Sequence, residues 1–163
     1  MRSSWGLEIW HWALGVKHWA LVIRDWKVGI LGSVLITFLA SCSRQEVKLT
    51  QYIRQGEELY LKNCSNCHQK DGNGLGLVYP PVSQSDFFDN DPAKVICLIE
   101  FGLEGELKVN GKSFNKPMPA QPALTDLEIA EITTYLYNSW GRERGIIDVS
   151  SVTSAINTCQ GKD

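Results

Sequence analysis

Residues 63–70 read NCSNCHQK, with two cysteines separated by two residues and a histidine directly after the second. No second Cys-x-x-Cys pair occurs in the 163 residues. A zinc ribbon needs such a second pair, and a thioredoxin-type redox motif needs βαβ surroundings, which the neighbouring sequence does not indicate. The isolated motif therefore points to another chemistry for the same three side chains.

Cys64, Cys67 and His68 have the spacing of a c-type haem attachment site. In such a site the two thiols bond to the two haem vinyl groups, and the adjacent histidine reaches the iron from the same side. One motif predicts one covalent haem c.

Met118 is the predicted second axial ligand of that iron. It is the only methionine after Met1, and His68 is the only histidine after residue 41. Pro117 and Pro119 flank Met118 and favour an extended loop. A thioether favours ferrous iron, which suits an electron carrier. The alternative is a methionine that fills a gap in the core.

Local patterns predict a mainly α-helical domain. The spacing of apolar residues indicates the first and last helices. Two further helices begin at Asp91-Pro92 and at the capping box Thr125–Glu128. Asn110-Gly111 is typical of a type I′ turn. The expected elements are a helix over 50–63, a loop over 71–81, a helix over 92–102, a hairpin over 107–114, a helix from 126 to about 140 and a helix near 148–159.

The chain resembles the class I monohaem cytochromes c of bacterial respiratory chains over about residues 50–140. The matching residues are Gly56, Tyr60, Cys64, Cys67, His68, Gly72, Gly74, Pro80, Met118, Pro119 and the helix over 127–137. The resemblance implies a class I cytochrome c fold, to which the small β-hairpin and an extra C-terminal helix are additions. It also implies a contact of Gly56 or Tyr60 with Tyr135.

In that family a proline carbonyl accepts the proton on the outer nitrogen of the haem histidine. Alignment of the YPPV stretch assigns this role to Pro80, and Pro81 remains an alternative. Such a hydrogen bond orients the imidazole and raises its basicity.

The N-terminal part carries the pattern of a signal peptide. Arg24 and Lys27 precede the uncharged run Val28–Leu39, whose dozen or so residues are fewer than the roughly 20 that span a bilayer. Residues 39–42, LASC, resemble the lipobox of bacterial lipoproteins, so Cys42 is the predicted lipidation site. An ordinary cleavage site beside an unrelated cysteine is the alternative.

These segments predict three parts. Residues 1–41 are an N-terminal extension plus lipoprotein signal peptide, 42–49 a short polar tether, and 50–163 the cytochrome c domain. Translation that begins nearer the apolar run would place the extension upstream of the protein. The export signal indicates an oxidising compartment, where the remaining Cys97 and Cys159 are expected to form a disulfide. Two buried free cysteines are the alternative.

These observations predict electron transfer on the periplasmic side of a membrane, by a lipid-anchored carrier or cytochrome subunit without catalytic residues. The expected partners are an oxidase, a quinol-oxidising complex or a dehydrogenase. A net charge of -2 without a basic block argues against nucleic acid. The alternative function is a haem sensor or haem enzyme with a displaceable sixth ligand.

Overall fold

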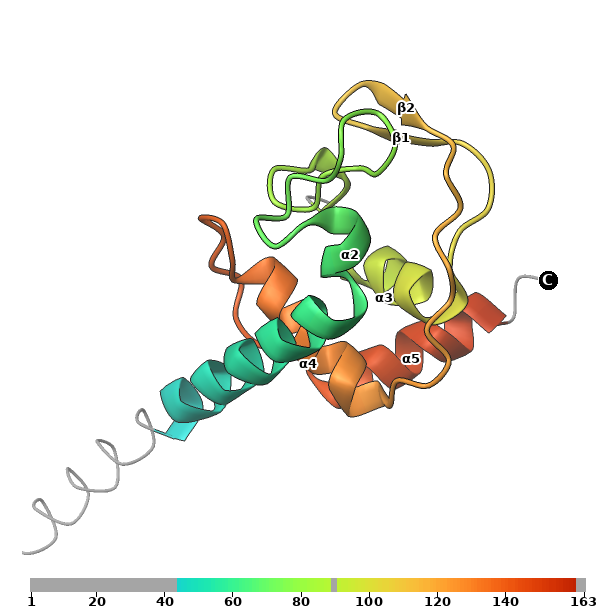
Figure 1. Cartoon of the computed structure of the whole chain (residues 1–163). Coiled ribbons are helices and arrows are strands. Elements are labelled where there is room, and N and C mark those ends of the chain that lie inside the picture. The colour runs from blue at the N-terminus through green and yellow to red at the C-terminus, as the bar shows by residue number, and fades with distance from the viewer. Residues whose placement is uncertain (1–43, 89–90, 161–163) are drawn as a thin grey trace, which may run out of the picture. The chain divides into compact units, whose positions relative to one another are not determined.

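Helices build most of the fold in the computed structural model, which describes residues 44–88 and 91–160 (Figure 1). Residues Val47–Asp163 form one unit by their mutual contacts, separate from Met1–Glu46. The elements are a helix over 44–63, α2 (Ser65–His68), the short 3-10 helix η1 (Asp86–Phe88), α3 (Pro92–Phe101), β1 (Leu107–Val109), β2 (Lys112–Phe114), α4 (Asp126–Tyr137) and α5 (Val149–Gln160).

The two predicted helix starts are confirmed. The Asp91 side chain accepts a hydrogen bond of 3.0 Å from the backbone N–H of Ala93 at the start of α3. At the start of α4, the Thr125 side chain accepts from the N–H of Glu128 while the Glu128 carboxylate accepts from the N–H of Thr125. Both caps satisfy backbone donors that have no partner within the helix.

The predicted hairpin is also confirmed. β1 and β2 pair antiparallel, and the turn residues Asn110 and Gly111 have φ of 51° and 71°, as a type I′ turn requires. Asn110 then fixes the hairpin to the rest of the domain. Its N–H donates to the Asp86 carboxylate at 2.8 Å, and its side-chain oxygen accepts from the N–H of Asp86 at 3.0 Å.

Two predicted boundaries differ from the structure. The helix predicted over 50–63 begins at residue 44, within a polar stretch that contains no glycine or proline to interrupt it. The helix predicted to reach about residue 140 ends at Tyr137, because the backbone leaves helical geometry at Asn138, with φ of -124° and ψ of 18°. Residues 1–43, including the predicted signal peptide and Cys42, lie outside the described residues.

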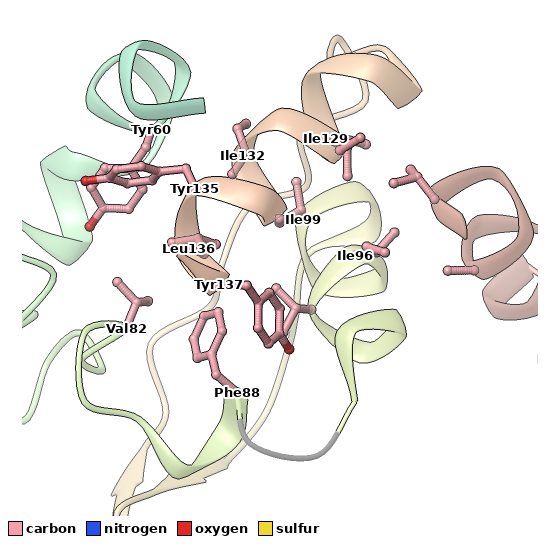
Figure 2. Packing of buried hydrophobic residues seen from close by; sticks show 14 residues of the cluster. Tyr60, Val82, Phe88, Ile96, Ile99, Ile129, Ile132, Tyr135, Leu136 and Tyr137 are labelled. Atoms are coloured by element: carbon pink, nitrogen blue, oxygen red, sulfur yellow. The ribbon is translucent and has the colours of Figure 1, made fainter. Parts of the chain in front are cut away.

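The core lies where the 44–63 helix, α3 and α4 meet (Figure 2). Tyr60 and Tyr135 contact each other with ring centroids 5.4 Å apart, which confirms the expected contact between the first and last helices of the cytochrome region. Phe88 and Tyr137 form a second pair at 5.5 Å. These rings and the isoleucines of α3 and α4 hold the helices that surround the site.

α5 packs against both α3 and α4, so the C-terminal helix is part of the same unit (Figure 1). The predicted architecture, mainly helical with a small antiparallel hairpin and an added C-terminal helix, is thus confirmed. Within residues 44–88 and 91–160, none of the helices has both the length and the apolar character needed to cross a bilayer.

Candidate functional site

The cysteine motif begins where the 44–63 helix ends. The N–H of Cys64 donates to the carbonyl of Tyr60 at 2.9 Å, and the N–H of His68 donates to the carbonyl of Cys64 at 3.0 Å. This helical path places residues 64, 67 and 68 on one side, since positions three and four apart share a helix face. Cys64 and Cys67 are both unpaired and half-buried.

The Cys64 thiol is protonated at neutral pH. Burial, together with the nearby Cys67, raises the pKa of Cys64 to about 11. A structural zinc site needs thiolates, so the raised pKa disfavours zinc at this pair of cysteines.

The imidazole of His68 is held in one orientation. Its Nδ1 lies 3.0 Å from the carbonyl oxygen of Pro80. A carbonyl can only accept, so Nδ1 carries the proton and Nε2 keeps its lone pair for a metal. Burial lowers the pKa of His68, an effect that the hydrogen bond to Pro80 partly opposes. The ring is consequently neutral, as a metal ligand must be.

The loop from Gly72 to Val82 wraps over this histidine. The N–H of Gly74 donates to the carbonyl of His68 at 2.9 Å, and the carbonyl of Gly72 accepts from the N–H of Val82 at 2.7 Å. Gly74 has φ of 67°, and a Cβ there would lie 2.7 Å from the carbonyl carbon of Pro80. Glycine at this position lets the loop close tightly around the carbonyl that accepts from His68.

A cavity of about 130 Å³ opens beside these residues. Cys64, Cys67, His68 and Met118 all line it. The remaining wall is largely apolar, and its members from α3 and the hairpin are Val95, Leu98, Ile99, Leu107, Val109 and Phe114.

Met118 reaches the cavity from a paired segment of backbone. Its N–H and carbonyl exchange hydrogen bonds of 2.9 Å with those of Leu103, which follows the end of α3. The sequence predicted an extended loop here but not this partner. The bridge fixes the backbone from which the thioether projects.

The residues present fit a covalently bound haem. Two unpaired thiols, a neutral imidazole with a free Nε2 lone pair, a methionine and an apolar lining meet in one cavity. Haem requires these parts: thioether bonds, an axial ligand and a dry, apolar surround that sets its potential.

The structure brings five of the eight predicted site residues together. Cys64, Cys67, His68 and Met118 line the cavity, and Pro80, which also lines it, accepts from His68. Cys97 and Cys159 lie apart from this group and are bonded to each other, with Cα atoms 6.1 Å apart. Cys42 is outside the described residues.

Sequence reasoning missed Arg142, which donates hydrogen bonds to the carbonyls of Val82 and Ser83 beside the cavity. Its surroundings, Gly141 to Gly145, read as an ordinary charged surface loop. No local pattern marks it, because both acceptors lie about sixty positions earlier in the chain.

A mainly helical fold with a Cys-x-x-Cys-His motif at the wall of an apolar cavity defines a c-type cytochrome domain. Comparison with known proteins supports this class. The family described as "Cytochrome C oxidase, cbb3-type, subunit III" matches residues 51–136, just over half of the chain, and the chain belongs to this family.

The relatives are cytochromes from several settings. Cytochrome c-552 of Thermus thermophilus is 28% identical over 90 residues, which cover 53% of this chain and 68% of the relative. Cytochrome c6 of Euglena viridis is 34% identical over 86 residues, 51% of this chain and 87% of the relative.

The cytochrome c subunit of the quinone-dependent alcohol dehydrogenase of Gluconobacter oxydans is 30% identical over 101 residues. The match covers 60% of this chain but only 21% of that subunit. Across these relatives the shared property is haem-based electron transfer. The protein is therefore a c-type cytochrome with covalently bound haem.

Proposed function

We propose that this cytochrome holds one haem c with His68 and Met118 as the two axial ligands, and that it carries electrons without catalysing a reaction. One observation carries the proposal. His68 and Met118, the only methionine of the described residues, line the same cavity as two unpaired cysteines. The Nδ1–H of His68 donates to the Pro80 carbonyl.

When bound, haem supplies an iron that cycles between ferrous and ferric states. The chain's own residues set the conditions for that cycle. His68 offers a neutral nitrogen whose basicity is increased by the hydrogen bond to Pro80. Met118 offers a soft, neutral sulfur that favours the ferrous state, and the apolar wall excludes water.

The Met118→Ala variant tests the axial pair. The oxidised wild-type protein is expected to show the near-infrared band of methionine-to-iron ligation, and the variant is expected to lose it. Leu103→Ala is the matched control, since Leu103 lines the same cavity and pairs with Met118 only through backbone atoms. A band that persists in the Met118→Ala protein contradicts the proposal.

A sensor or enzyme with a displaceable sixth ligand is the alternative within the same class. Carbon monoxide separates the two. A carrier with a firmly held thioether binds it slowly, whereas an open or readily vacated sixth position gives a high-spin spectrum and rapid binding. The Leu103–Met118 backbone bridge favours the carrier, because it restrains the segment that bears the ligand.

The partners we propose are redox proteins that exchange electrons with this domain, either transiently or as neighbouring subunits. An oxidase, a quinol-oxidising complex and a dehydrogenase are the candidates. The names of the matching family and of the Gluconobacter relative are consistent with an oxidase and a dehydrogenase respectively. Co-purification from membranes, followed by identification of the associated redox protein, decides among them.

We also propose a lipid anchor at Cys42 that keeps the domain on the periplasmic face of a membrane. The lipobox-like residues 39–42 after an apolar run support it. Attached acyl chains contribute about 0.8 kcal/mol per buried CH₂, and two or more give stable anchoring. Cys42→Ala should move the haem protein from the membrane to the soluble fraction without changing its visible spectrum. Membrane association that survives the substitution contradicts the anchor.

A further inference from the structure

Arg142 lies beyond the family-matched region and yet contacts the haem side of the domain. Its guanidinium donates to three backbone carbonyls: to Leu136 at 3.0 Å from Nη1, and to Val82 at 2.9 Å and Ser83 at 2.5 Å from Nη2. One side chain therefore joins the last turn of α4 to the end of the loop that covers His68.

The loop after α4 is built to present this side chain. The Asn138 amide nitrogen donates to the carbonyls of Thr134 and Gly145, both at 2.7 Å. Its oxygen accepts from the N–H groups of Arg144 at 3.0 Å and Gly145 at 2.9 Å. The hydrogen bonds of Asn138 thus close residues 138–145 into a loop that contains Arg142.

The segment that Arg142 holds leads directly to the acceptor of the histidine. The N–H groups of Val82 and Ser83 donate to the carbonyl of Gly72 at 2.7 and 2.9 Å, while their own carbonyls accept from Arg142. Pro80 comes two residues before Val82, and the intervening residue is also a proline with a restricted φ. Fixing Val82 therefore fixes the direction of the Pro80 carbonyl.

A second side chain of the same loop supports the other end of this segment. Trp140 packs against Gly72, where an added Cβ would lie 2.8 Å from the indole Cζ2. The loop after α4 consequently contacts the loop that covers His68 at both ends: the Trp140 ring packs on Gly72, and the Arg142 guanidinium donates to Val82 and Ser83.

We propose that Arg142 is a positioning residue that holds the Pro80 carbonyl against Nδ1–H of His68 and so keeps the imidazole in its ligating orientation. The inference rests on the proposed function, because it takes His68 as the iron ligand. It adds a residue outside the family-matched region to the set that determines the ligand's basicity.

Arginine suits this role better than lysine. Its planar fork reaches carbonyls in different directions at once, and it stacks on aromatic faces. Here the guanidinium carbon lies 4.9 Å from the centroid of Phe88. A lysine at the same position keeps the positive charge but cannot reproduce the three hydrogen bonds.

Arg142→Lys in the holoprotein tests the proposal. We expect the Nδ1 proton of His68 to exchange with deuterium about fivefold to tenfold faster, as the loss of a net hydrogen-bond contribution predicts. We also expect a more positive reduction potential, since a less basic imidazole stabilises the ferric state less. Because the charge is conserved, this shift does not arise from removal of a cation.

Arg144→Lys is the matched control on the same loop, and it should leave both measurements unchanged. Asn138→Ser provides a second variant, which loosens the loop that contains Arg142 but retains the guanidinium. Asn138→Ser is expected to change proton exchange and reduction potential in the same direction but by less. It serves as the test of the proposal if Arg142→Lys yields no holoprotein.

The proposal is overturned if a variant that folds, Arg142→Lys or Asn138→Ser, has lower thermal stability but unchanged proton exchange and unchanged reduction potential. Arg142 would then only stabilise the fold. A wild-type protein without the methionine band is a different result. It counts against the proposed axial pair, whereas the comparison of proton exchange between wild type and variant still reports on Arg142.

Discussion

Gly56 lies where the 44–63 helix comes closest to α4. A Cβ at this position would overlap the carbonyl oxygen of Glu131 and lie 2.7 Å from the Cβ of Tyr135. Backbone atoms cannot move aside as a flexible side chain can. The close approach in turn brings Tyr60 against Tyr135 and sets the position of the cysteine motif that follows.

Gly56→Ala is therefore expected to lower the free energy of unfolding by about 2 to 3 kcal/mol, the upper part of the range for overpacking. Urea denaturation of the holoprotein measures it. Gly76→Ala is the control, because Gly76 has φ of 57° but nothing near its missing Cβ, so only backbone strain of about 1 kcal/mol applies. Equal losses in the two variants would show that the helix contact is not limiting.

Helix α4 depends on the capping box at its start. The Glu128 carboxylate accepts hydrogen bonds from the backbone and the hydroxyl of Thr125, which lower the pKa of Glu128 below its ordinary 4.5. Glu131, one turn further along, has its pKa raised by burial and by the neighbouring charge of Glu128. One helix thus carries two carboxyl groups with opposite effects on stability.

Glu128→Gln should make the protein less stable than wild type at about pH 6. The folded-state pKa of Glu128 is depressed, so its contribution is present above the unfolded value and is lost as the pH falls through the folded value. The difference in melting temperature between wild type and variant is expected to shrink as the pH falls from about 6 to about 3. A constant difference contradicts the assignment.

Glu131→Gln should act in the opposite sense. Its folded-state pKa is raised, so its stabilising contribution is present below the unfolded value and is lost as the pH rises through the folded value. The variant is therefore expected to melt above wild type at about pH 7 and to match it at about pH 3. Destabilisation at neutral pH would indicate a favourable role for the carboxylate instead.

Helix α5 joins the cytochrome region to the C-terminal part. It packs on α3 and α4, and the Thr153 hydroxyl donates to the carboxylate of Asp126 at the start of α4. The disulfide between Cys97 and Cys159 adds a covalent link to α3, which also supplies Val95 to the cavity wall. The C-terminal helix therefore supports the element that lines the haem cavity.

The double variant Cys97→Ser/Cys159→Ser is expected to lose about 4 kcal/mol of stability in urea, the chain-entropy value for a cross-link with a sequence separation of 62. Thiol labelling of the denatured, unreduced wild-type holoprotein provides the chemical check. It should label neither of these cysteines, and two labelled thiols would mean that the bridge does not form in the protein as produced.

Elements specified by neighbouring residues were predictable. Asp91-Pro92, Asn110-Gly111 and Thr125–Glu128 each begin or turn an element through contacts within a few positions, and all three are confirmed. Element ends were less predictable. The helix predicted to reach about residue 140 stops at Tyr137, since the chain turns there to carry Trp140 and Arg142 back toward residues 72–83.

Residues close together in the sequence account for the haem attachment motif and its histidine and for the local elements around them, and Met118 is the only methionine after Met1. Three contacts became known only from the packing of the helices: the Pro80 carbonyl, rather than that of Pro81, accepts from His68, Leu103 pairs with Met118, and Arg142 donates to the loop that covers His68. The physical reason is the range of the interactions. Haem attachment and helix caps depend on residues a few positions apart, whereas these hydrogen bonds join segments 12 to 60 positions apart whose meeting depends on how the helices pack.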